Sequence, residues 1–224
     1  MDIIEAIKKR KSIRGYRQDA VPREVIRDIL EAAVRAPSAM NTQPWEFAVL
    51  TGKPLRMVGE ECVKKLRSAE NPHPDHEVIG WTNDSVYRTR QVELAKHIFQ
   101  VMNIPREDKA KRAAWMERGL RYFDAPTAII IMVDRALSEA APLLDLGAVM
   151  QTICLASLHY GIGTCIHDQG VMYPDVVRRH AGISETKRLI VAISLGYPDE
   201  GDIANTITTS REPVDNITSW VGFE

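Results

Sequence analysis

The chain has 224 residues, of which 45% are hydrophobic and 26% are charged, and its formal net charge is −1. That length allows one domain with a sizeable core, and the charge balance lacks the positive excess that a nucleic-acid-binding surface needs. We expect no membrane partner either, because no apolar run reaches the roughly 18 residues that span a bilayer and the first five residues lack the features of a signal peptide. Three cysteines without a CxxC pair indicate a reducing, cytoplasmic location.

The first part of the chain alternates helical and extended patterns. Ile3, Ile4 and Ile7 have helical spacing and predict a helix over residues 2–9. A second helix is expected to begin near Pro22, a residue suited to the first helical position, and to end near Ala36, because a residue before proline avoids the helical region. A polar loop (37–44), a strand (45–50), a turn (51–54) and a helix (55–68) are then expected in that order.

A long insertion precedes the second half of the chain. Residues 69–84 contain prolines and predict an irregular segment, and two polar helices are expected over 86–102 and 106–122. The remaining elements are a strand (128–133), a helix (142–160) capped by Gly161, a strand (164–167), a helix (173–181) and a strand (189–195). The tail over 200–224 has aromatic residues but no core of its own. Mixed helices and strands predict an α+β domain.

Arg10, Ser12 and Arg14 form the first group of candidate binding residues. In an extended segment, alternate side chains face the same way, so two guanidinium groups and a hydroxyl would share one face. Arginine offers a rigid fork of donors to phosphate, and serine adds another donor. The alternative interpretation is a solvated basic turn that follows the first helix.

Three further motifs have the composition of ligand-binding loops. The loop from Pro37 to Trp45 holds small and amide residues that can both donate and accept hydrogen bonds, although it can also be a simple helix-to-strand connector. The segment from Gly161 to Gln169 has two glycines that permit a close approach to a ligand, but it is not a dinucleotide-binding GxGxxG motif. The segment from Thr208 to Pro213 places one arginine among hydroxyl groups.

In this order, the motifs Arg10 to Arg14, Pro37 to Trp45, Gly161 to Cys165, Gly196 to Pro198 and Ser210 to Pro213 cover most of the chain. The ordered set resembles the FMN-dependent nitroreductase family. The pattern from Tyr87 through Asp124-Ala125-Pro126 is similar to its long-lid, nitrobenzoate-reductase-like members and, more distantly, to the iodotyrosine deiodinases. The resemblance implies one α+β domain over 1–224 with a central, mostly antiparallel sheet flanked by helices. It also implies an intertwined homodimer in which the tail over 200–224 embraces the partner.

The resemblance assigns the cofactor-binding residues as well. It implies that Arg10, Ser12 and Arg211 hold the FMN phosphate with help from Lys11, and that Arg14 lies near the pyrimidine edge of the flavin. It implies that the partner subunit covers the flavin with Pro37, Ser38, Ala39 and Asn41. Backbone groups at Ile166, His167 and Asp168 would meet flavin N5 and O4, and whether His167 or Asp168 lies nearer to N5 stays open. Some members carry lysine where this chain has Thr209.

The insertion over 69–122 is expected to form a lid above the flavin. It carries Tyr87, Arg88 and Trp115, which suit a flat, anionic aromatic compound, although such side chains can also simply pack the helices together. His73 and His76 lie in a proline-rich stretch, and we predict no metal site there.

No residue is an obvious nucleophile or general acid, so no catalytic side chain is assigned and the flavin is expected to carry the redox chemistry. The resemblance implies ping-pong reduction of a small aromatic acceptor, such as a nitroaromatic or a quinone, by NADH or NADPH. Two alternatives remain, which are reductive dehalogenation of a halophenol and a flavin-binding module that turns over nothing.

Overall fold

Two continuous apolar runs form the centre of a four-stranded sheet in the computed structural model, which describes residues 2–77 and 80–223. Positions 78 and 79 of the expected lid, and position 224 of the tail, lie outside the described residues. The strand order is β1-β2-β4-β3, and each neighbouring pair is antiparallel. The strands are β1 (Glu46–Thr51), β2 (Thr127–Asp134), β3 (Gly163–His167) and β4 (Lys187–Gly196). The expected α+β fold with an antiparallel sheet is therefore confirmed.

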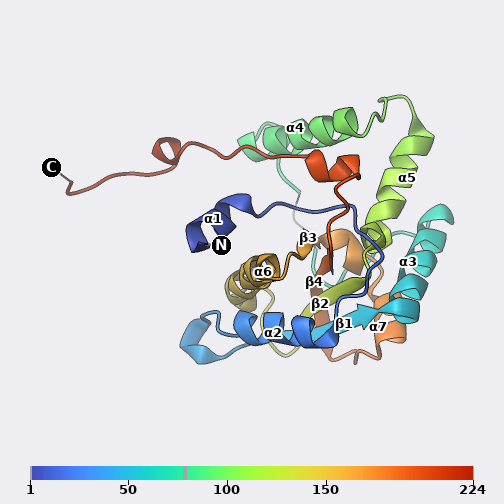
Figure 1. The fold of residues 1–224 in the computed structure, drawn as a ribbon, viewed down its shortest axis with the longest axis horizontal. Helices are drawn as coiled ribbons and strands as arrows, with labels where there is room; N and C mark the ends of the chain where they lie inside the picture. The colour runs from blue at the N-terminus through green and yellow to red at the C-terminus, as the bar shows by residue number, and fades with distance from the viewer. Residues whose placement is uncertain (1, 78–79, 224) are drawn as a thin grey trace.

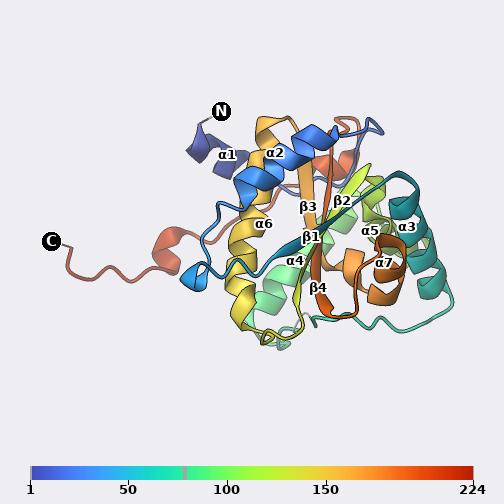
Figure 2. The same cartoon turned by 90° about the horizontal axis from the view of Figure 1, so that it is seen from below.

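The side chains of β2 alternate between two hydrophobic cores, because successive residues of a strand face opposite sides. Ile129 and Ile131 belong to the core on one face, whereas Ile130 and Met132 belong to the core on the other. Helices α2 (Arg23–Ala33) and α6 (Ala141–His159) cover the first face, and α3 (Gly52–Arg67) and α7 (Pro174–Ala181) cover the second. Figure 2 shows the sheet between these two layers.

Helix α6 is, within the described residues, the one helix long and apolar enough to cross a membrane. Its Leu146, Val149 and Ile153 side chains are fully buried against α2 and the sheet, so α6 is a core helix of the domain, as its sequence predicts. Its expected end is confirmed as well, since Gly161 follows the helix with a φ of +69°.

The turn expected over 51–54 is wrong, because helix α3 begins at Gly52 directly after β1. Gly52 has a φ of +57°, a left-handed conformation that glycine adopts without steric cost, and this lets the chain reverse within one residue. Pro54 lies in the first turn, where the missing N–H costs the helix nothing. The Gly-Lys-Pro sequence that suggested a turn therefore starts a helix.

The insertion contains the two expected helices, which are shorter than predicted. They are α4 (Val86–Val101) and α5 (Lys109–Leu120). No side chain of α4 is buried in the single chain. After α5 the chain turns through Tyr122, Phe123 and Asp124, all three with φ between +55° and +58°, before it enters β2.

Both ends of the chain leave apolar side chains exposed. Helix α1 (Ile3–Lys9) has no buried residue. After η4 (Ile203–Thr206) the tail passes α4 and then runs away from the domain, and η5 (Val214–Asn216) lies on this extended part, as Figure 1 shows. Its Trp220 and Phe223 side chains pack edge-on against each other with ring centroids 5.5 Å apart, yet they remain 61% and 78% exposed.

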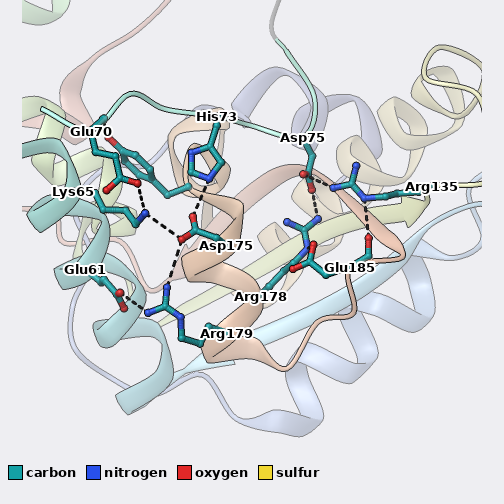
Figure 3. A network of polar contacts seen from close by, with 11 residues as sticks. Glu61, Lys65, Glu70, His73, Asp75, Arg135, Asp175, Arg178, Arg179 and Glu185 are labelled. Atoms are coloured by element: carbon teal, nitrogen blue, oxygen red, sulfur yellow. Dashed lines mark hydrogen bonds and ion pairs between the residues drawn. The ribbon is translucent and has the colours of Figure 1, made fainter.

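Asp75 anchors the start of the insertion to the sheet and α7 (Figure 3). Its carboxylate accepts hydrogen bonds from the Arg178 and Arg135 side chains and from the backbone N–H of Leu189, the last at 2.9 Å. The Asp75 and Arg178 side chains are more than nine-tenths buried. A second group of ion pairs lies beside it, formed by Lys65, His73, Asp175 and Arg179. The irregular segment is thus fixed at its first residues.

These contacts give Asp75 a pH-dependent role. Burial raises the pKa of Asp75, but the hydrogen bonds from Arg178, Leu189 and Arg135 outweigh it, so the pKa lies below its ordinary value. A carboxyl group with a lowered pKa stabilises the fold above its unfolded pKa of about 4, and this contribution is lost as the pH falls further.

We predict that Asp75→Asn lowers the free energy of unfolding at pH 7 by about 3 kcal/mol, because the buried Arg178 guanidinium loses its anionic partner. Urea denaturation measures the effect, with Glu139→Gln at an exposed position as the control expected to change stability little. The difference between Asp75→Asn and the unchanged protein should shrink as the pH falls below about 4. Equal stabilities of the two proteins at pH 7 would contradict this account.

Candidate functional site

The segment over residues 10–15 runs along β3. Ser12 forms a parallel bridge with Thr164, and the Ile13 N–H donates to the Thr164 carbonyl at 2.9 Å. Ile13 is buried in the core, while Arg10, Ser12 and Arg14 are half-buried. The segment therefore alternates between core and surface, as its extended conformation requires.

The three half-buried side chains lie near two cysteines. Burial raises the pKa of Cys165, and the Arg14 charge, the Ser12 hydroxyl and the Arg10 charge lower it in part. Burial also raises the pKa of Cys154, which Arg10 lowers in part. Both thiols are thus protonated and inert at neutral pH, and the two arginines lie close to the same stretch of β3.

Arg10 and Arg14 have no carboxylate within ion-pair distance among residues 2–77 and 80–223, whereas Arg118 and Arg178 each face one. Lys11 donates to the backbone carbonyl of Asn205 at 2.6 Å. Half-buried guanidinium groups without an anionic neighbour suit a phosphorylated ligand, which supplies the missing charge and a matching set of acceptors. The residues present therefore fit the phosphate of FMN.

The end of β3 carries the three residues expected near flavin N5 and O4. Ile166 is 37% exposed and Asp168, which begins η3 (Asp168–Val171), is exposed. Partial burial of its carboxyl group raises the pKa of Asp168, against the opposing charge of His76. His167 is buried instead. Of the two side chains that the sequence left open, Asp168 points to the surface and His167 points inward.

His167 is enclosed by aromatic rings and one hydroxyl. Its Nε2 lies 2.7 Å from the Ser194 Oγ, and its ring packs edge-on against Tyr122 and Phe123 at 5.4 and 5.2 Å. Within the described part of the chain its Nδ1 has no hydrogen-bond partner. Burial and then the charge of Arg14 lower the pKa of His167 to about 3, so the imidazole is neutral at physiological pH.

The loop expected to cover a flavin from the partner lies apart from the 10–15 segment. Helix α6 contacts both α1 and α2 and lies between the segment and the loop (Figure 1). Ser38 is half-buried, whereas Pro37, Ala39 and Asn41 are exposed. The Ser38 Oγ accepts from Gln43 N at 3.0 Å, and Asp145 accepts from Ala39 N at 3.1 Å. The structure thus holds this loop in place but does not bring it to Arg10, Ser12 and Arg14.

The predicted lid residues divide into two groups. Trp115 on α5 packs 6.2 Å from Phe123 and joins the core cluster around Ile13, so it lies beside the 10–15 segment. Tyr87 and Arg88 lie on α4, where the Tyr87 ring packs 5.0 Å from Trp81. Of these three lid residues, Trp115 is therefore the one that the described contacts bring into the same core cluster as Ile13.

Arg211 lies in a groove between α4 and residues 208–212 of the tail. Its guanidinium donates to the Thr209 hydroxyl and the Ser210 carbonyl, each at 2.8 Å. No described contact joins Arg211 to Arg10 or Ser12. The tail segment is fixed to the insertion by an ion pair between Arg90 and Glu212 at 2.6 Å.

Two further residues shape the site through contacts that the sequence pattern does not predict. The Tyr122 hydroxyl donates to the Gly170 carbonyl at 2.6 Å and so fixes the turn after β3. The Asn205 side chain is bonded to the backbone of the 10–15 segment. Tyr122 lies in a left-handed turn without glycine, and Asn205 is 190 residues from its partner Gly15, so neither has a local sequence signal.

Comparison with known proteins identifies the family. A model of the nitroreductase family matches residues 7–197, and the chain belongs to this family. The predicted family is therefore confirmed.

The following relatives and solved structure match nearly the whole length of the chain. A nitrobenzene nitroreductase of Ectopseudomonas oleovorans is 31% identical over 98% of this chain and 96% of its own. A 4-nitrobenzoate reductase of Nocardioides sp. is 32% identical over 96% of this chain and 88% of its own. The crystal structure of the FMN and NADPH-dependent nitroreductase NfnB from "sphigopyxis sp. strain HMH" superposes with a TM-score of 0.94 at 26% identity, with both chains covered completely.

We predict that His167 stays neutral between pH 5 and 8. A lowered histidine pKa means that the unfolded chain binds the proton first, so stability falls by about 1.4 kcal/mol per pH unit from this group as the pH drops below about 6.5. NMR of the imidazole resonances, assigned by their absence in His167→Gln, measures the protonation. A titration midpoint near 6.5 would contradict the buried, neutral state.

Proposed function

We propose that this protein is an FMN-dependent oxidoreductase that reduces nitroaromatic compounds with NAD(P)H. The observation that carries the proposal is the pair of half-buried arginines, Arg10 and Arg14, which lie with Ser12 along β3 without carboxylate partners among the described residues. Relatives named as nitrobenzene and 4-nitrobenzoate reductases and a structural neighbour named as FMN and NADPH-dependent agree with it. Quinones are a further acceptor class for the same chemistry.

In this proposal, FMN would supply the two-electron redox chemistry between NAD(P)H and the acceptor. For a nitro group the balance is one NAD(P)H and one proton consumed, with a nitroso group and water formed. The chain supplies binding and electrostatics. Arg10 and Ser12 would hold the phosphate, with Lys11 and Arg211 assisting, and Arg14 would supply positive charge that favours the reduced cofactor. Backbone groups at 166–168 would bind the flavin ring edge.

We infer that the active protein is a homodimer. The loop over 37–41 holds amide and hydroxyl groups that would cover FMN, yet α6 keeps it from the 10–15 segment of its own chain. In a dimer, the 37–41 loop of each copy would reach the 10–15 segment of the other copy. The exposed apolar side chains of α1 and the tail support this arrangement, because packing against a partner removes them from water. Pro37, Ser38, Ala39 and Asn41 of one subunit then complete the other's site.

The insertion over 69–122 acts as the lid in this dimer. It is fixed at Asp75 and at α5, where Trp115 packs beside the 10–15 segment. Tyr87 is 53% exposed on α4, which buries no side chain in the single chain, so Tyr87 and the neighbouring Arg88 are available to an aromatic acceptor. Cytoplasmic location follows from the reliance on NAD(P)H.

The decisive experiment is reduction of purified protein under anaerobic conditions. We expect a yellow protein whose flavin absorbance is bleached by NADH or NADPH and restored by nitrobenzene or 4-nitrobenzoate. A colourless protein that takes up no added FMN would sink the proposal. Bleaching that only a halophenol reverses, with release of halide, would favour the dehalogenase, and absence of bleaching would favour a non-catalytic flavin-binding module.

The matched variants for this experiment are Arg10→Ala and Arg106→Ala. Arg10→Ala should weaken FMN binding by about 1.5–3 kcal/mol, the range for a hydrogen bond to a charged group. Arg106 is exposed outside the candidate site and has no carboxylate partner in the described structure, so its loss should leave FMN affinity unchanged. Equal affinities of the two variants would remove Arg10 from the site.

The dimer is tested by removing residues 213–224. We expect the mass in solution to fall from twice 25.2 kDa to about that of one chain, and FMN to dissociate, because the partner loop is lost. Multi-angle light scattering measures the mass. Trp220→Asp should act in the same direction, while Asp215→Asn, at an exposed polar position of the same tail, should keep the dimer. A truncated protein that stays dimeric would contradict the role of the tail.

A further inference from the structure

The side chain of Asn205 fixes the backbone of the 10–15 segment. Its Oδ1 accepts from Arg14 N at 2.8 Å and from Gly15 N at 3.1 Å. Its Nδ2 donates to the carbonyls of Gly15 and Asp199, at 2.7 and 2.8 Å. The Asn205 carbonyl accepts from Lys11 Nζ at 2.6 Å. Asn205 is 8% exposed, so all its polar groups are satisfied inside the protein.

The chemistry at this position requires a primary amide. Two N–H groups and two carbonyl oxygens converge on one buried side chain, and only an amide presents an acceptor to the first pair and two donors to the second. An aspartate would direct an oxygen at two carbonyl oxygens. A small apolar residue would leave the Arg14 and Gly15 N–H groups without a partner, and each such group carries a desolvation cost, whereas the two carbonyls would keep the hydrogen bonds that Asp199 N and Asp202 N donate to them.

A second contact from the same turn reinforces this junction. Asp202 caps Ala204 N at 2.9 Å and forms an ion pair with Arg118 of the lid helix α5. It approaches Gly15 so closely that a Cβ there would lie 2.2 Å from the Asp202 Oδ2. Gly15 is therefore required for the approach, and the turn around η4 joins the 10–15 segment, the lid and the start of the tail.

We propose that Asn205 is a positioning residue for the flavin, which acts by holding Arg14 in place. This inference rests on the proposed function. The amide bonds the backbone N–H of Arg14 itself, and the Arg14 charge is close enough to His167, at the end of β3, to lower its pKa. Because the guanidinium favours the reduced cofactor over the oxidised one, Asn205 sets the reduction potential of the flavin through Arg14.

The test compares Asn205→Ala with Thr206→Ala in the full-length holoprotein. Thr206 is exposed on the same turn, and its hydroxyl bonds only the Ile203 carbonyl. We expect Asn205→Ala to raise the FMN dissociation constant at least tenfold, and to weaken binding of reduced FMN more than binding of oxidised FMN. For a two-electron couple, the midpoint potential falls by about 30 mV for each factor of ten by which the dissociation constant of reduced FMN rises more than that of oxidised FMN. Thr206→Ala should keep the potential of the unchanged protein.

The potential separates positioning from a merely structural role. A local loss of structure would weaken both redox forms equally and leave the midpoint unchanged, and that result would overturn the proposal, as would unchanged FMN affinity. If Asn205→Ala does not fold, Asn205→Ser serves instead, because its hydroxyl still donates and accepts, and a smaller decrease in the same direction is expected. If the unchanged protein binds no FMN, the proposed function fails rather than this inference.

Discussion

Burial of both faces of the sheet is the constraint on which the rest of the structure depends. β2 and β4 bury nearly every side chain, with alternate residues in the two cores, and helices cover both faces. The sheet centre is therefore closed to ligands. Binding groups can lie only at strand ends and edges, and β3 is an edge strand that ends at His167. The 10–15 segment covers that edge, which places its arginines along the end of β3.

The second edge of the sheet and the tail lie outside these two cores. The opposite edge belongs to β1, which pairs only with β2 among the described strands. The tail, which would otherwise pack against the domain, extends away from it and carries Trp220 and Phe223 into solvent. Burial of one large apolar side chain contributes about 1.5–3 kcal/mol, so these residues alone offer a substantial driving force for association. The exposed tail and the separated loop are thus two independent observations that support the proposed homodimer.

The sequence predicted the features that depend on local pattern. Runs of β-branched residues located β2 and β4, and the glycine after α6 marked the end of that helix. The turn predicted over 51–54 was wrong because glycine and proline occur both in turns and at the start of helices. Gly52 and Pro54 are typical of a turn, yet they begin α3, because the left-handed φ of Gly52 reverses the chain before the helix.

Other features depend on contacts that no local pattern contains. The left-handed turn at Tyr122 has no glycine, and it persists because Tyr122 is fully buried and bonded to Gly170. Asn205 has an ordinary sequence neighbourhood, and its partners are about 190 residues away. Ordered motifs and family resemblance found Arg10, Ser12 and Arg14, but only coordinates show which side chains hold that segment in place.

The charge at the end of β3 depends on the burial of His167. A protonated His167 would place a second positive charge in an aromatic cage near Arg14, and burial already disfavours it, so the imidazole remains neutral. The guanidinium group is the side-chain cation that does not deprotonate in proteins. The positive charge available to an anionic cofactor is therefore fixed in amount, and what the protein can adjust is its position. The position of this charge depends on the Arg14 backbone, which the uncharged side-chain amide of Asn205 holds. Because an amide does not titrate, the placement of the charge does not change across the neutral pH range.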